Sequence, residues 1–304
     1  MSVHPFILFD THAHADAFSA IQWREVCGRA QQRGVRGCLS AGVWWDSFER
    51  LLSDFASDVI ARCDGRDSFE QALLHLNGFA ILPALGLHPM EIARRWRAAD
   101  GSFDETQAIF DAQQMRRVAE RFKKWIWAIG ETGFDANKNM LEGWLSKQEL
   151  LRAQQFAFLE CSQLSAELRL PLVIHSRSAW QQTRTSIESA LAAGVPKFMI
   201  HCYGGPAEDV YWLAKLGGFA SFGGVLTWPD ARRVRQAFVN CPAAAILFET
   251  DSPDLSPLLA DGGRPDMNEP VFLTDVIAEA AVIRGVSSDE LAELNWKNFC
   301  EFLF

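Results

Sequence analysis

The chain has 304 residues, of which 49% are hydrophobic and 22% are charged. This is the composition of an ordinary globular protein, and it excludes a disordered, collagen-like or coiled-coil chain as the main organisation. The formal net charge is −9, with 29 Lys and Arg against 38 Asp and Glu, so the broad basic surface typical of nucleic-acid-binding proteins is absent. Binding a polyanion would therefore need a local source of positive charge, such as metal ions or a small basic rim.

The cysteines and the apolar segments indicate a cellular compartment. Seven cysteines are scattered along the chain without a Cys-x-x-Cys pair, which is typical of reduced thiols in a cytosolic protein. The first residues lack the positively charged and apolar regions of a signal peptide. The longest apolar stretch, 79–87, contains Pro83 and Gly86 and is too short to span a bilayer. We therefore expect a cytoplasmic protein without a membrane segment.

Short apolar segments alternate with longer amphipathic segments along the chain. Most of the short segments are continuous apolar runs, as expected for parallel strands buried on both faces. The predicted strands are Phe6–Phe9, Val35–Val43, Phe79–Leu87, Ile126–Gly130, Pro171–Ile174, Phe198–Ile200, Phe219–Phe222 and Ala245–Phe248. The predicted helices are Trp23–Gln32, Glu49–Ile60, Gln107–Lys124, Lys147–Leu168, Ala179–Ala193, Pro206–Leu216, Ala231–Val239, Val271–Arg284 and Asp289–Leu303. Ser287 and Glu290 form a capping-box pattern before the last helix.

This alternation predicts the fold. Eight β–α units in unbroken order favour an α/β protein of the (β/α)8 TIM-barrel class, with residues 1–304 as a single domain with extended βα loops. A doubly wound open sheet is the alternative, because the sequence does not reveal the order of strands in a sheet. Two polar segments, Cys63–Asn77 and Glu91–Thr106, exceed usual connection lengths and are expected to be insertions.

The first chemical signal follows the first predicted strand directly. Residues two apart in an extended segment point the same way, so His12 and His14 can offer two imidazoles to one ion. Alone this pattern is weak, because such pairs also arise by chance. Its position after a strand is what gives it weight.

Four further predicted strands end in a residue that can bind a metal. Glu131, His175, His201 and Asp251 follow the fourth, fifth, sixth and eighth strands. Barrel enzymes carry their active sites at the carboxyl ends of the strands, so these residues and the two histidines are expected to converge on one mouth. Each residue alone is more simply a hydrogen-bonded strand-end residue, but six such residues at the ends of five strands favour a shared metal site. Six candidate ligands are more than one tetrahedral zinc ion binds, and they suit two divalent ions bridged by a carboxylate.

With these residues in place, the chain resembles the TatD-type metal-dependent deoxyribonucleases, within the amidohydrolase-like superfamily of TIM barrels. The resemblance runs from residue 9 to the C-terminus in matching order and spacing. It rests on Phe9-Asp10-Thr11-His12-Ala13-His14, Gly86-Leu87-His88-Pro89, Gly130-Glu131-Thr132-Gly133-Phe134-Asp135, Val173-Ile174-His175-Ser176-Arg177, Ile200-His201-Cys202-Tyr203-Gly204-Gly205, Glu249-Thr250-Asp251-Ser252-Pro253 and Asn268-Glu269-Pro270.

The resemblance implies two metal sites and three catalytic residues. The ligands of the first ion would be His12, His14, Glu131 and Asp251, and those of the second would be His175, His201 and the other oxygen of Glu131. Asp251 would also orient the nucleophilic water and accept its proton, and Glu131 would bridge the ions. His88 would contact a phosphate oxygen or donate a proton to the leaving group, with a hinge residue beside Pro89 as the alternative. Asp16 and Asp135 would shape the surrounding loops.

Three positions depart from the family pattern near the expected mouth. Ser178 replaces an Asp, Asp254 replaces an aromatic residue, and Met267 replaces a basic residue of many relatives. The last two changes remove a stacking face and a positive charge. Long-range attraction to a duplex should therefore be poor, and the salt dependence of activity should be shallow.

Aromatic and basic residues outside these motifs offer further binding candidates. Trp180 and Trp228 follow strand ends and would either stack on a nucleobase or, as we favour, pack between barrel and helices. The run Arg94-Arg95-Trp96-Arg97 would either hold a nucleic-acid backbone or form a solvated loop.

The sequence thus predicts a hydrolase of DNA phosphodiester bonds that depends on two divalent ions, Mg, Mn or Zn. The predicted activity is a 3′-end-directed exodeoxyribonuclease that prefers the ends of single-stranded DNA. One alternative is an amidohydrolase-like enzyme that cleaves a C–N or ester bond of a small molecule with the same metal-activated water. A second alternative is an inactive barrel that acts as a binding protein.

Overall fold

The computed structural model describes residues 7–76 and 78–304. Its eight strands form one parallel sheet in which each strand pairs with the next in sequence. The strands are β1 (Leu8–Ala13), β2 (Val35–Ser40), β3 (Ala80–Leu85), β4 (Ala128–Asp135), β5 (Leu172–Arg177), β6 (Phe198–Ile200), β7 (Phe219–Phe222) and β8 (Ile246–Phe248). Asp251 N donates to His12 O at 3.0 Å and His14 N donates to Ser252 O at 2.8 Å, which joins the two ends of the sheet. The fold is therefore the predicted TIM barrel and not an open sheet.

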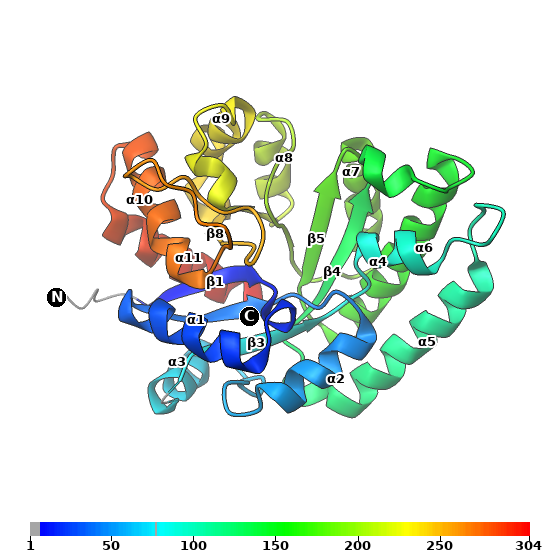
Figure 1. Ribbon diagram of the computed structural model, residues 1–304, viewed down its shortest axis with the longest axis horizontal. Coiled ribbons are helices and arrows are strands. Elements are labelled where there is room, and N and C mark those ends of the chain that lie inside the picture. The colour runs from blue at the N-terminus through cyan, green and yellow to red at the C-terminus, as the bar shows by residue number, and fades with distance from the viewer. Residues whose placement is uncertain (1–6, 77) are drawn as a thin grey trace.

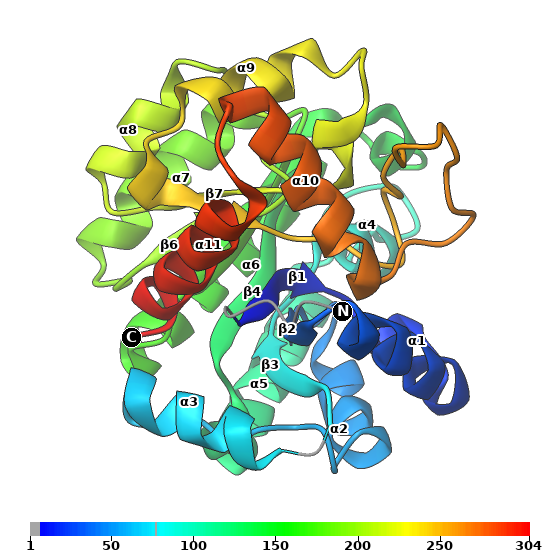
Figure 2. The same cartoon turned by 90° about the vertical axis from the view of Figure 1, so that its left-hand side faces the viewer.

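Helices surround this barrel (Figures 1 and 2). They are α1 (Ala20–Gln32), α2 (Trp45–Asp54), α3 (Arg66–His75), α4 (Pro89–Arg95), α5 (Glu105–Phe122), α6 (Lys147–Leu168), α7 (Trp180–Ala192), α8 (Asp209–Lys215), α9 (Arg232–Asn240), α10 (Leu273–Arg284) and α11 (Ser288–Leu303). Among the described residues, none of the helices has both the length and the apolar character needed to cross a membrane. Ser287 and Glu290 form the predicted capping box at the start of α11.

The two faces of the strands belong to two buried clusters. Alternate residues such as Leu82, Val173 and Leu247 form one cluster with Trp296 and Phe299 of α11. The residues between them on the strands pack outward into the larger cluster with the surrounding helices. Because side chains alternate across a strand, the first cluster fills the barrel interior and the second fills the layer between barrel and helices. The barrel is thus a packed core, and its open space lies at one end.

Several elements begin or end elsewhere than the sequence predicts. The first predicted strand began at Phe6, which lies outside the described residues, and β1 continues as far as Ala13. The fourth was predicted to end at Gly130, but β4 runs to Asp135 and all eight of its residues are buried. The helix predicted over Glu49–Ile60 is shifted to α2, because Val59 forms a bridge with Ile81 of β3.

The two segments expected to be insertions are partly helical. The region Cys63–Asn77 contains α3, although Asn77 itself lies outside the described residues. The region Glu91–Thr106 begins inside α4 and continues through a short antiparallel bridge between Arg97 and Phe103.

The basic run in this second region does not form a stacking surface. Trp96 is completely buried, and its indole Nε1 donates to Asp111 at 2.8 Å. Arg94 and Arg95 both form ion pairs with Glu91. The interpretation of this run as an aromatic and basic nucleic-acid contact is therefore wrong, because its aromatic residue belongs to the core.

The two strand-end tryptophans lie against other side chains. The Trp180 ring contacts the rings of Tyr203 and Trp212, and its Nε1 donates to Asp209 at 2.6 Å. The Arg264 guanidinium lies 4.1 Å from the Trp228 ring centroid. The packing interpretation of Trp180 is confirmed, and one face of Trp228 is already covered.

Candidate active site

A cavity of about 900 Å³ opens at the carboxyl ends of the strands. Five of the six predicted metal ligands line it, and these are His14, Glu131, His175, His201 and Asp251. The sixth, His12, is completely buried beside them. The structure thus brings all six residues together at the mouth, as the strand-end pattern predicts.

The first donor cluster consists of His12, His14, Glu131 and Asp251. His12 Nε2 lies 3.2 Å from Glu131 Oε2 and 3.3 Å from Asp251 Oδ1. His14 Nε2 lies 3.5 Å from each of the same two oxygens and 3.4 Å from His12 Nε2. Ligands held tetrahedrally at about 2.1 Å from one ion are separated by about 3.4 Å from one another. The spacing therefore fits a single divalent ion.

The second donor cluster uses the other oxygen of Glu131. His175 Nδ1 lies 2.7 Å from Glu131 Oε1, and His201 Nε2 lies 2.8 Å from it. The two imidazole nitrogens are 3.1 Å apart. Neighbouring ligands around an octahedral ion lie about 3 Å apart, so this cluster also has the dimensions of a metal site.

Close backbone approaches bring the two clusters together. Gly133 has a φ of +143°, and a side chain there would overlap the backbone of His175 on the neighbouring strand. A side chain at Gly86, in the loop after β3, would overlap the backbone around Glu131. Both glycines therefore allow the strands to approach the bridging carboxylate closely.

Contacts outside the clusters orient several imidazoles. His14 Nδ1 lies 3.1 Å from Ala41 O, a contact that directs Nε2 toward the first cluster. His175 Nε2 lies 3.5 Å from Asp135 Oδ2. Asp16 also lines the cavity, beside His14. Both aspartates thus lie at the periphery of the donor clusters.

The charge balance of the site favours a cation. Burial raises the pKa of Glu131, but His201, His88 and His12 outweigh it and hold that pKa well below its usual range. Burial lowers the pKa of His14, yet Asp251 and Glu131 raise it to about 9. In the metal-free protein, protons on the histidines therefore balance the buried carboxylates. A divalent ion can replace those protons, so the donor set fits a metal.

His88 reaches the same carboxylate from the loop after β3. Its Nε2 lies 3.1 Å from Glu131 Oε1, and its Nδ1 accepts a hydrogen bond from Met90 N at 3.0 Å. Burial lowers the pKa of His88 and so favours the neutral imidazole, although the nearby Glu131 opposes this shift. Because Nδ1 accepts, the single proton is on Nε2 and points into the site. His88 is thus a hydrogen-bond donor at the mouth as well as the N-cap of α4.

Two buried carboxylates at the site, Asp10 and Glu249, were not predicted from the sequence. Asp10 accepts a hydrogen bond from Thr250 N at 2.9 Å, and burial raises the pKa of Asp10 to about 7. Glu249 Oε1 accepts from Cys202 N at 2.6 Å and lies 3.6 Å from His201 Nδ1. Each precedes a predicted ligand by two residues, so the two-residue period of an extended chain was a usable signal.

Residues 9–303 match the model of the family described as TatD related DNase. The chain belongs to this family. YcfH of Escherichia coli K12, named an uncharacterized metal-dependent hydrolase, is 30% identical over 296 residues, which cover 96% of this chain and 94% of the relative. TatD of Erwinia amylovora, named a 3′-5′ ssDNA/RNA exonuclease, is 32% identical over 270 residues, which cover 88% of each protein.

A solved structure supports the fold assignment. YjjV of Escherichia coli K12, described as a TatD homolog, has a TM-score of 0.75 and 23% sequence identity, with 97% of each chain covered. Together with the family match, the histidine and carboxylate clusters make this chain a metal-dependent hydrolase of the TatD family.

The three departures from the family pattern lie in different places in this TatD-family hydrolase. Ser178 and Asp254 line the cavity. Met267 is 37% exposed and is not among the residues that line it. The sequence-based placement of Met267 at the substrate is therefore not supported, whereas Asp254 does add a carboxylate to the mouth.

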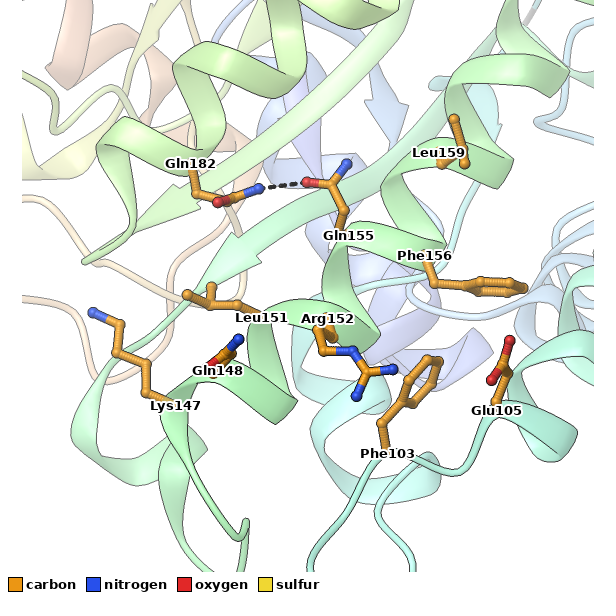
Figure 3. A pocket seen from close by; sticks show the side chains of 10 residues that line it. All are labelled: Phe103, Glu105, Lys147, Gln148, Leu151, Arg152, Gln155, Phe156, Leu159 and Gln182. Carbon is orange, nitrogen blue, oxygen red and sulfur yellow. Dashed lines mark hydrogen bonds between the residues drawn. The ribbon is translucent and has the colours of Figure 1, made fainter.

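A separate hollow lies over α6 on the outside of the barrel (Figure 3). Apolar side chains of Phe103, Leu151, Phe156 and Leu159 line it beside charged and amide groups. Among the described residues that line it, Glu105 is the only carboxylate, and there is no histidine or cysteine. This hollow lacks a metal-ligand set, so the catalytic chemistry belongs to the cavity at the strand ends.

Proposed function

We propose that this TatD-family hydrolase cleaves phosphodiester bonds of single-stranded DNA from the 3′ end with two divalent ions. The observation that carries the proposal is the division of the donors into two clusters, each with one oxygen of Glu131. His12, His14 and Asp251 complete the first cluster, and His175 and His201 complete the second. A carboxylate shared in this way is the expected bridge of a two-metal site.

The ions would be Mg, Mn or Zn, and they would supply a water of lowered pKa and neutralise negative charge on the scissile phosphate. Asp251 Oδ1 lies 3.3 Å from His12 Nε2 of the first cluster and 3.8 Å from Nδ1 of His201, whose Nε2 belongs to the second cluster. From this position its carboxylate orients the attacking water and accepts a proton from it. Glu131 holds the two ligand sets at a fixed separation.

His88 supplies a hydrogen bond to the substrate. A neutral imidazole with its proton on Nε2 would become an unfavourable imidazolate if it gave that proton away. Its role is therefore to donate a hydrogen bond to a phosphate oxygen, and not to protonate the leaving group. Of the two substrate roles that the resemblance implies for His88, we therefore propose the phosphate contact.

The preference for single-stranded ends has two supports. TatD of Erwinia amylovora is named a 3′-5′ ssDNA/RNA exonuclease. The net charge of −9 gives weak long-range attraction to a stiff duplex, whereas a flexible chain end can enter the cavity and reach the clusters.

The test is hydrolysis of a 3′-labelled single-stranded oligonucleotide with Mg, Mn or Zn added to metal-free protein. We expect stepwise release of labelled mononucleotides, slower cleavage of the matched duplex, and no cleavage by Glu131→Gln. A panel of amides and lactones is assayed in parallel. Internal cleavage of duplex DNA at a higher rate, or efficient amide or lactone hydrolysis without nuclease activity, would overturn the proposal.

A further inference from the structure

An apolar strip lines one side of the cavity at the barrel mouth. It consists of Val43, Met90 and Met140, which lie in the segments after β2, β3 and β4. Met90 is in the first turn of α4, and Met140 is in a short 3-10 helix, Lys138–Leu141. Met90 is 43% exposed, and the other two residues are half-buried. Since these segments follow consecutive strands, the three residues form one surface, which we call the apolar ledge.

Backbone contacts hold the apolar ledge beside His88. His88 N donates to Val43 O at 3.0 Å, and Met90 N donates to His88 Nδ1 at 3.0 Å. The short helix that carries Met140 packs against α4, which in turn packs against β4 (Figure 1). His88 Nε2 lies 3.1 Å from Glu131 Oε1. The ledge therefore adjoins the imidazole that contacts the scissile phosphate in the proposed function.

The basic residues of the cavity lie away from the apolar ledge. Among the described residues that line the cavity, they are Arg50, Arg177 and Arg233. Arg177 ends β5, and Arg233 lies on α9 after β7. Arg50 lies on α2, and its Nη2 is 3.4 Å from the backbone oxygen of Asp16, which follows β1. The segments after β3 and β4 therefore contribute no lysine or arginine to the described part of the lining.

The substrate of a 3′-end-directed nuclease is asymmetric about the scissile phosphate. That phosphate is the last one of the strand, so the terminal nucleotide extends beyond it with a sugar and a base alone. The remaining strand carries a phosphate at every step and is held best near positive charge. A ledge with apolar side chains and no basic residue therefore matches the terminal nucleoside, and the side with Arg177 and Arg233 matches the remaining strand.

We propose that Met90 and Met140, together with Val43, bind the base of the 3′-terminal nucleotide. The proposal rests on the proposed function and adds the subsite for the nucleotide that is released. Methionine suits this role because its unbranched thioether adapts to surfaces of different shape and its sulfur contacts aromatic rings favourably. Every base has such a ring face, so the ledge accepts purines and pyrimidines alike. The identity of the terminal base should therefore change kcat/KM by no more than about threefold.

The first test removes the base from the substrate and the thioether from the protein. Two thymidine dodecamers are compared, one unmodified and one with an abasic tetrahydrofuran residue at its 3′ terminus. The ratio of kcat/KM for the two substrates measures the base contact, and in the wild type we expect it to be about 100. It should be about tenfold lower in Met90→Ala and in Met140→Ala, the effect of losing roughly 50 Å² of apolar contact.

Matched variants separate a base contact from a structural role. Met267→Ala removes a methionine that is 37% exposed and lies outside the cavity lining, so it should keep the wild-type ratio. Met90→Leu retains most of the apolar surface and should stay within about threefold of that ratio. With the abasic residue at the penultimate position instead, all of these proteins should give one common ratio. The proposal is overturned if Met90→Ala and Met140→Ala behave like Met267→Ala, or if they change the penultimate ratio instead.

A binding measurement distinguishes failure of this proposal from failure of the proposed function. Calorimetry with metal-loaded protein compares thymidine 5′-monophosphate with 2-deoxyribose 5-phosphate, which lacks the base. If the wild type cleaves no oligonucleotide, the proposed function fails, but weaker binding of the nucleotide alone by Met90→Ala and Met140→Ala still supports the ledge. If the wild type cleaves the dodecamer and both variants keep its preference for the base, the ledge is overturned and the proposed function stands. A wild type that cleaves nothing and binds both compounds equally overturns both.

Discussion

The two donor clusters share Glu131 but differ in charge. The first combines one oxygen of Glu131 with the carboxylate of Asp251 and the imidazoles of His12 on β1 and His14 directly after it. The second has only the other oxygen of Glu131, with the imidazoles of His175 on β5 and His201 directly after β6. Because the number of charged ligands sets much of the affinity for a divalent ion, the first site should bind more tightly. If both sites bind an ion as proposed, the ion of the first site should be held more firmly and the ion of the second should exchange more readily.

The largest expected effect comes from removing the feature that the clusters share. Glu131→Gln takes a charge and an oxygen donor from both sites, so we expect activity to decrease at least ~1000-fold. Metal content measured by elemental analysis should decrease at both sites, while circular dichroism should show an intact barrel. Wild-type turnover with two ions bound would contradict the shared-carboxylate arrangement.

Single-cluster variants test whether the sites are separable. His12→Ala should empty mainly the first site and His175→Ala mainly the second, and each should lower activity roughly 100-fold or more. Anomalous scattering from crystals of each variant would locate the remaining ion. Loss of both ions in every variant would show that the clusters bind metal as one unit.

His88→Asn tests a residue that is not among the six predicted ligands, although its ring lies close enough to Glu131 and His175 to share an ion with them. Asn can still cap α4 through its side-chain oxygen, but its shorter side chain no longer places a donor at Glu131. We expect kcat to decrease about 100-fold with two ions still bound. Loss of the second ion in this variant would instead make His88 a metal ligand.

The smallest expected effect comes from Glu249, which contacts His201 of the second cluster from outside the donor set. Glu249 lies 3.6 Å from His201 Nδ1 and accepts from Cys202 N, so it orients the imidazole from behind. Glu249→Gln should weaken binding of the second ion about tenfold, as measured by metal titration, and leave the affinity of the first site unchanged. Equal weakening of both ions would assign Glu249 a general structural role.

The sequence predicted the positions of the ligands better than the limits of the strands. Apolar runs mark the parts of strands that lie in the core, so β6 and β7 have the predicted bounds. The polar ends of β4 and β5 continue to pair through their backbones, with Gly133 opposite His175 and Asp135 opposite Arg177. Hydrophobicity does not report such pairing, and both strands were predicted too short.

Tertiary contacts account for what the sequence could not show. The approach of His88 to Glu131 depends on where the loop after β3 folds. The burial of Trp96 and the position of Met267 outside the cavity depend in the same way on packing between distant segments. Residue type and spacing predicted which groups meet at the mouth, but not which nearby groups turn away from it.

The junction at which the segments of β1 and β8 meet and close the barrel has a consequence for biosynthesis. The first cluster spans this junction, because His12 lies on β1 and His14 directly follows it, whereas Asp251 follows β8. A ribosome delivers these two sides near the beginning and near the end of translation. A nascent chain that has not yet exposed Asp251 lacks a ligand of the first ion, so metal cannot complete that site early in folding. If the first site binds an ion as proposed, retention of that ion reports that synthesis has passed the eighth strand and that the barrel has closed.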